Sequence, residues 1–222
     1  MKKIIVLLFA ENVGSSWICD GLSNCDEIVA PVFEPLAQDI NLQLDGVVQS
    51  FGKVFLENLL HQQSLVEFNR QSSSVSGDNY ETLSVQEFDT ANAILFKARQ
   101  HEYTQHISQS EFHNLFEDRK DAISIIHLIR RNKMHQAASI YRRRVIKKDH
   151  FQTYRSQKQL TGSEVFDEDG FLKILWDAIY QDTMAELVFE NAPFKKYRLI
   201  YEDFLSNVDG ELDNLSDFLN MP

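Results

Sequence analysis

The N-terminal stretch constrains the fold of this chain more than any other part of its sequence. Residues Lys3 to Phe9 form a continuous apolar run with several β-branched members, which is typical of a buried strand. A loop with one glycine and two serines follows, Ala10 to Ser16, and we expect a helix to begin at Trp17. In open α/β sheets such a unit gathers loop amides and the positive end of the helix dipole around one point. The stretch therefore predicts a binding site for a phosphate or sulfate group.

The remaining pattern predicts a single α/β domain over residues 1–222, with a central, mostly parallel sheet flanked by helices and a P-loop-like first turn. Further strands are expected at Ile28 to Val32, Ala93 to Ala98, Ala122 to Ile129 and Tyr197 to Tyr201. Apolar spacing predicts helices at Val47 to His61, Glu111 to Arg119, Met134 to His150, Asp169 to Glu190 and Leu205 to Leu219. Polar composition predicts loops at Ser72 to Asn79 and Thr161 to Glu168.

Composition excludes several classes of protein. The net charge of −11 argues against nonspecific binding of nucleic acid, which needs a basic surface. Only two cysteines, Cys19 and Cys25, are present, so a reducing compartment fits better than a disulfide framework. No run approaches the roughly 20 apolar residues of a membrane span. We expect a cytoplasmic protein with no nucleic-acid partner and no integral membrane segment.

The first loop reads Asn12-Val13-Gly14-Ser15-Ser16-Trp17. It lacks the Gly-Lys-Ser/Thr ending with which a P-loop lysine reaches the terminal phosphates of a nucleoside triphosphate, and it lacks the Gly-x-Gly-x-x-Gly of dinucleotide-binding folds. One glycine, two hydroxyls and an aromatic ring suit a single phosphate with a flat group stacked nearby. An ordinary strand–helix turn with serine caps and a core tryptophan is the alternative interpretation.

A second candidate anion site follows the strand that ends at Ile129. Paired arginines, Arg130 and Arg131, come directly after this strand, and Ser139 lies on the second turn of the next helix. A guanidinium fork and a hydroxyl can bind one anion together, and strand ends are where open α/β sheets place ligands. We favour this interpretation for Arg131 and Ser139. For the later basic residues we favour a solvated helix face: Arg142, Arg143, Arg144, Lys147 and Lys148.

Taken together, these segments resemble the sulfotransferases that use 3′-phosphoadenosine 5′-phosphosulfate (PAPS). The first loop resembles the family's 5′-phosphosulfate loop, and Arg131 with Ser139 eight residues later resembles its 3′-phosphate site. Tyr201-Glu202-Asp203 resembles the family's signature at the last strand, whose tyrosine lies near the adenine. The resemblance spans nearly the whole chain and is nearest to the bacterial and carbohydrate-directed branches. The cofactor-binding residues that it implies are Asn12, Val13, Gly14, Ser15, Ser16, Trp17, Arg131, Ser139 and Tyr201.

The resemblance also implies catalytic residues. Glu34, in Phe33-Glu34-Pro35, matches the glutamate that is the proposed base in carbohydrate-directed relatives, and a solvent-exposed turn residue is the alternative. Lys97 resembles the lysine at the exit of the family's central strand, whose charge can stabilise the transferring group. His101 is a second candidate base, with an ordinary loop histidine as the alternative. No metal is expected, because loop amides and basic side chains can balance the charge.

The loop departs from the family at one position. The family has Arg or Lys two residues before the loop glycine, whereas this chain has Asn12 beside the acidic Glu11. The resemblance implies sulfuryl transfer from PAPS, with PAP as product, to a hydroxyl of a small-molecule or carbohydrate acceptor. The alternative is a relative that binds a nucleotide or sulfated ligand without transfer. A nucleotide or sugar kinase is a weaker alternative, because the P-loop lysine is missing.

Overall fold

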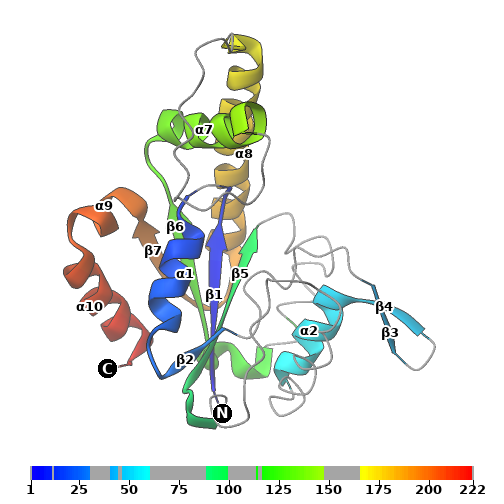
Figure 1. The fold of residues 1–222 in the computed structure, drawn as a ribbon. Helices are drawn as coiled ribbons and strands as arrows, with labels where there is room; N and C mark the ends of the chain where they lie inside the picture. The colour runs from blue at the N-terminus through cyan, green and yellow to red at the C-terminus, as the bar shows by residue number, and fades with distance from the viewer. Residues whose placement is uncertain are drawn as a thin grey trace.

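The predicted first strand is the centre of the sheet. In the computed structural model, β1 (Lys3–Phe9) pairs in parallel with two strands, and the five-stranded sheet has the order β2-β5-β1-β6-β7 (Figure 1). The other strands are β2 (Ile28–Val29), β5 (Ala93–Arg99), β6 (Ile123–Ile129) and β7 (Lys195–Ile200). The structure describes residues 2–11, 13–30, 41–44, 47–60, 89–99, 114, 117–147 and 166–221. The predicted α/β class and parallel sheet are confirmed.

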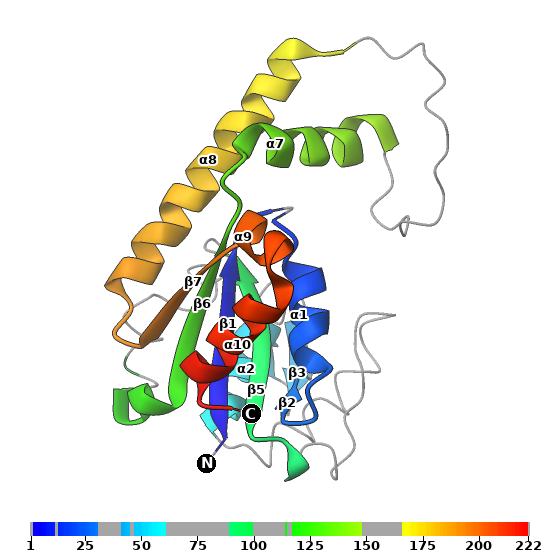
Figure 2. The same ribbon diagram turned by 90° about the vertical axis from the view of Figure 1, so that its left-hand side faces the viewer.

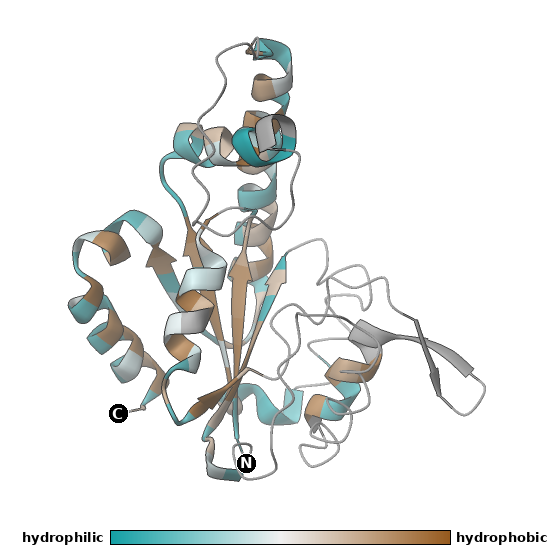
Figure 3. Ribbon diagram, in the orientation of Figure 1, coloured by the Kyte–Doolittle hydropathy of each residue, from teal (hydrophilic) through white to brown (hydrophobic). Residues whose placement is uncertain are grey.

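Helices cover both faces of the sheet (Figure 2). Ile4, Val6 and Leu8 of β1 point to one face and pack in a cluster with side chains of α2 (Phe51–Leu60) and α8 (Glu168–Asn191). Alternate β1 residues pack in a second cluster with α1 (Ser15–Ser23), α9 (Tyr201–Ser206) and α10 (Val208–Leu219). Burial on both faces explains why β1, β5 and β6 are buried almost continuously and are mostly hydrophobic rather than alternating (Figure 3).

Two helices extend beyond the carboxyl ends of the strands. Here α7 (Lys133–Tyr141) packs against the N-terminal half of α8 (Figure 1). A small cluster of Ala137, Tyr141 and Phe171 joins the two helices, and the Tyr141 hydroxyl accepts a hydrogen bond of 2.8 Å from the amide of Asp167. None of the helices among the described residues has the length and apolarity to cross a membrane.

The prediction of one helix from Val47 to His61 is wrong at its start. β3 (Asn41–Leu44) and β4 (Val47–Ser50) form a separate antiparallel pair, and α2 begins only at Phe51. The β-branched pair at positions 47 and 48 favours a strand, and the apolar spacing there does not distinguish a short strand from the first helical turn.

Other helix boundaries also differ from the prediction. The predicted 134–150 helix is α-helical to Tyr141 and continues as a π-helix, η2 (Arg142–Lys147). The predicted final helix is split at Asn207, whose side chain accepts a hydrogen bond of 3.3 Å from the amide of Gly210 and caps α10. Of the predicted 111–119 helix, residues 114 and 117–119 are described: residue 114 is helical, and the last three belong to a 3-10 helix, η1 (Glu117–Ala122). The predicted Ser72–Asn79 loop lies outside the described residues.

A histidine is buried between the sheet and α8. His127 of β6 is 1% exposed, and its Nδ1 lies 3.1 Å from Oε2 of Glu186. Glu186 in turn forms an ion pair with Arg198 of β7. Burial lowers the pKa of His127 to about 4, although Glu186 favours the protonated ring. This histidine is therefore neutral in the folded protein near neutral pH.

The buried histidine predicts a pH dependence of stability. In the unfolded chain His127 takes up a proton near pH 6.5, whereas in the folded protein it does so only near its lowered pKa of about 4. Between these values the unfolded state binds more protons, so stability rises with pH, by up to about 3 kcal/mol across the window. Urea unfolding at pH 7 and pH 4.5 should show a smaller loss for His127→Gln than for the wild type. Equal losses would contradict the prediction.

Candidate functional site

A cleft of about 290 Å³ lies at the carboxyl ends of the central strands. Ligands in open α/β sheets bind at this edge. Strand ends, the first loop, α7, η2 and the exit from β7 all contribute to its lining. The lining residues are Phe9, Glu11, Gly14, Ser15, Ser16, Trp17, Arg99, Arg130, Ser139, Arg143 and Tyr201.

The first loop is held against the exit of β7 by Gly14. This residue has φ of +90°, and a Cβ there would lie 2.5 Å from the Tyr201 ring, so both the conformation and the close approach require glycine. Its carbonyl accepts a hydrogen bond of 3.2 Å from the amide of Ile18 in the first turn of α1. The predicted loop–helix unit is therefore present, with the helix beginning at Ser15 rather than Trp17.

Lys97 brings a positive charge to the same loop. Its side chain is 3% exposed, and Nζ donates a hydrogen bond of 3.0 Å to Oγ of Ser16. The ammonium also lies 5.6 Å from the centroid of the Phe9 ring. Ser16 lines the cleft, so Lys97 acts on the cleft from beneath its lining.

The two arginines after β6 point to different places. The guanidinium of Arg130 lies 5.0 Å from the centroid of the Tyr201 ring, and Arg130 lines the cleft together with Ser139. Arg131 does not line it: its side chain is 59% exposed and forms a two-pronged ion pair with Asp203, with Nη1 2.9 Å from Oδ1. Arg130, which the sequence places as a neighbour, is thus the arginine of this pair inside the cleft.

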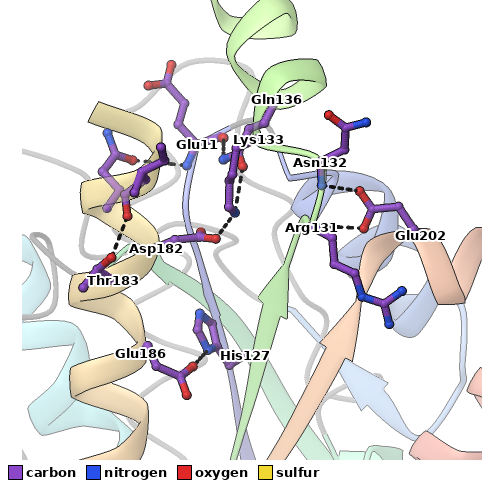
Figure 4. A network of polar contacts seen from close by, with 12 residues as sticks. Glu11, His127, Arg131, Asn132, Lys133, Gln136, Asp182, Thr183, Glu186 and Glu202 are labelled. Atoms are coloured by element: carbon purple, nitrogen blue, oxygen red, sulfur yellow. Dashed lines mark hydrogen bonds and ion pairs between the residues drawn. The ribbon is translucent and has the colours of Figure 1, made fainter. Parts of the chain in front are cut away.

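The Tyr201-Glu202-Asp203 segment clamps the loop between β6 and α7. The carboxylate of Glu202 accepts hydrogen bonds of 3.0 Å from the amides of Arg131 and Asn132 (Figure 4). Burial alone would raise the pKa of Glu202, but these two amides and nearby Arg130 outweigh it and lower the pKa below its ordinary value. The clamp holds Arg130 next to the Tyr201 ring.

Glu11 joins the end of β1 to the helices above the sheet. This residue is 7% exposed, and its carboxylate forms ion pairs with Arg143 and Arg144 of η2. The interpretation as a solvated face is wrong for Arg143, which lines the cleft. Arg144 is exposed, as that interpretation expects, although it also pairs with the buried carboxylate. The acidic residue at the end of β1 was the available signal, because a buried carboxylate needs a cationic partner.

Of the other predicted site residues, two lie in the described part of the chain and three do not. Trp17 lines the cleft, is 48% exposed and contacts the Phe204 ring edge-on at 5.3 Å between centroids. The side chain of Val13 is buried in the core beneath the loop, so only its backbone is available to a ligand. Asn12, Glu34 and His101 lie outside the described residues. Across the described part of the chain, no group of three or more metal-ligating side chains is gathered.

Two of the solved structures that align with this chain are sulfotransferases. The sulfotransferase domain of the Synechococcus PCC 7002 olefin synthase aligns with a TM-score of 0.55 and 15% identity, over 99% of this chain and 74% of that one. A sulfotransferase from Alicyclobacillus acidocaldarius aligns with a TM-score of 0.51 and 12% identity, over 100% of this chain and 82% of that one. The fold is sulfotransferase-like. No model of a known protein family and no curated protein matches the sequence.

The geometry of the first loop predicts a sharp difference between two glycines near the N-terminus. Gly14→Ala should destabilise the protein by about 1–3 kcal/mol, because alanine is strained at this φ and its methyl group collides with Tyr201. Gly21→Ala is the control: no atom lies within 4 Å of a Cβ there, and alanine favours the helix by up to about 1 kcal/mol. Urea unfolding measures both effects. Similar changes in stability for the two substitutions would contradict the strained conformation and close Tyr201 contact assigned to Gly14.

Proposed function

We propose that this protein transfers a sulfuryl group from PAPS to a hydroxyl group. One observation carries the proposal: the first loop, the β6–α7 segment and the Tyr201 segment, which the sequence separates widely, line one cleft. The sulfotransferase-like fold supports the same function. A carbohydrate or a glycolipid-like molecule is the proposed acceptor, on the strength of the resemblance to carbohydrate-directed relatives.

The side chains of the cleft suit a nucleotide with several anionic groups. Arg99, Arg130 and Arg143 line it, and guanidinium groups form two-pronged hydrogen bonds with phosphate oxygens. Trp17 and Tyr201 add flat aromatic surfaces that suit an adenine. Among the described lining residues Glu11 alone carries a carboxylate, and it is already paired with arginines. The chemistry of this donor set fits PAPS or PAP.

Specific roles follow from this placement. Backbone and hydroxyl groups of Gly14, Ser15 and Ser16 are proposed to hold the 5′-phosphosulfate, with the loop residues Asn12 and Val13 contributing backbone groups. Ser139 is proposed to hold the 3′-phosphate together with Arg131, as the resemblance implies, and with Arg130, which lines the cleft. Trp17 and Tyr201 are proposed to flank the adenine. When bound, PAPS supplies the activated sulfuryl group.

The resemblance supplies the proposed catalytic groups. Lys97, through its position at Ser16, stabilises negative charge that develops near the loop, and this charge balance requires no metal ion. Glu34 is the proposed base that takes the proton of the acceptor hydroxyl, with His101 as the second candidate. Asn12, in place of a basic residue, motivates the alternative of a protein that binds a nucleotide or a sulfated ligand without transfer.

Titration with PAP tests the binding site. We expect micromolar affinity by calorimetry, and Arg130→Ala and Arg131→Ala should each raise Kd about tenfold or more, because a charge-assisted hydrogen bond contributes about 1.5–3 kcal/mol. If only Arg130→Ala weakens binding, the 3′-phosphate assignment of Arg131 is wrong. If the wild type fails to bind PAP at millimolar concentration, the nucleotide site is refuted, and with it the transferase.

Transfer of radiolabelled sulfate from PAPS to a panel of carbohydrate acceptors tests the reaction. Glu34→Ala should lower the transfer rate about a hundredfold or more while leaving the Kd for PAP unchanged, since loss of a general base affects the chemical step. His101→Ala is the matched variant, and a loss there with an active Glu34→Ala would move the base to His101. Tight PAP binding without transfer to any acceptor would favour the alternative function, a protein that binds the nucleotide and does not transfer sulfate.

A further inference from the structure

Glu11 is the one acidic side chain among the described residues that line the cleft, where it lies among arginines. Oε1 of Glu11 contacts Nη2 of Arg143, and Oε2 contacts Nη2 of Arg144. Of these two arginines only Arg143 lines the cleft. A carboxylate that is 7% exposed needs compensation, and two guanidinium groups against one carboxylate leave a net positive charge.

The backbone of Glu11 is held in place from two other helices. Its amide donates a hydrogen bond of 3.3 Å to Oε1 of Gln181 in α8, and its carbonyl accepts one of 2.7 Å from Nε2 of Gln136 in α7 (Figure 4). Gln136 is 0% exposed. Lys133 completes this junction by contacting Gln136 and Asp182. The Glu11 carboxylate is therefore a fixed point at the end of the central strand.

The helix that carries the two arginines has an unusual geometry. Neighbouring residues of an α-helix do not face the same point, yet Arg143 and Arg144 both reach one carboxylate. The segment that carries them is π-helical, a rare geometry that is frequent at functional sites. The Arg143 side chain remains 38% exposed, and its buried Nε has no hydrogen-bond partner among the described residues. Since Arg143 also lines the cleft, its partly exposed side chain is accessible to a ligand there.

We propose that Glu11 is a positioning residue that holds Arg143 over the cleft, where the Arg143 guanidinium binds an anionic group of the ligand directly. The identity of the ligand as PAPS or PAP rests on the proposed function, whereas anion binding by Arg143 does not. The ion pair serves to orient a cation, and the π-helical turn is the device that brings it to the lining.

A simple structural ion pair makes the opposite prediction for Glu11→Gln. If Glu11 contributed only its charge, removal of a negative charge beside a bound anion would strengthen binding by Coulomb attraction. If Glu11 orients Arg143, the substitution releases the guanidinium and binding weakens, even though the net charge becomes more positive. The direction of the change in Kd therefore separates the two roles.

The experiment uses calorimetric titration of the full chain with two probes, PAP and inorganic pyrophosphate. We expect Arg143→Gln to raise the Kd for both probes about tenfold and Glu11→Gln to raise it about threefold or more. Arg144→Gln is the matched control, since it removes a neighbouring partner of the same carboxylate that does not line the cleft, and its Kd should stay within about twofold. Arg143→Lys, which keeps the charge without the fork, should recover part of the loss. Circular dichroism and thermal unfolding establish that each variant is folded.

The two probes separate this inference from the proposed function. Suppose that the wild type binds pyrophosphate but not PAP. A weaker affinity of Arg143→Gln for pyrophosphate would then support the inference and refute the proposed nucleotide ligand. PAP binding that Arg143→Gln leaves unchanged would overturn the inference and leave the proposed function standing. Equal losses in Arg143→Gln and Arg144→Gln, or tighter binding by Glu11→Gln, would also overturn it. Failure of the wild type to bind either probe at millimolar concentration would overturn both.

Discussion

The pairing of β1 with a strand on either side is the constraint on which the rest of the structure depends. Its register with β5 and β6 is continuous, and helices cover both of its faces, so the position of its carboxyl end is fixed. The parallel neighbours end at the same edge, which brings Lys97, Arg99 and Arg130 close to the loop that follows β1. The cleft is a direct consequence of this topology.

Two kinds of contact then shape the cleft. The Tyr201 ring packs on Gly14 and against Arg130, while Glu202 binds the amides of the β6–α7 loop, so the exit of β7 positions both the first loop and the β6–α7 segment. On the opposite side, Glu11 pairs with arginines of η2 and joins the loop to the helices above the sheet. Both contacts act through buried or half-buried charges, whose interactions water screens poorly.

Much of the fold was predictable, because the strands are local apolar runs buried on both faces. β1 has the bounds that the sequence predicts, and β5, β6 and α8 lie within about two residues of their predicted ranges. The β3–β4 pair was missed because the apolar spacing over the four residues of β4 fits either a short strand or the first turn of a helix. The first loop, Ser139 and Tyr201, which the sequence or the family resemblance singles out, line the cleft, and Lys97 donates a hydrogen bond to that loop; their proposed roles stay predictions. For Arg143 the sequence offered only a basic helix.

The sequence by itself determined the parallel α/β architecture and the strand–loop–helix form of the first loop, because hydrophobic runs and a strand–Gly-Ser-Ser–helix pattern act locally. Only the tertiary structure decided which charges face the cleft. Arg130 rather than Arg131 lies beside Tyr201, and Arg143 reaches Glu11 across more than a hundred residues of sequence. Such pairings depend on how strand ends and helices meet in space, and helical periodicity alone does not distinguish a solvated arginine from one that neutralises a buried carboxylate.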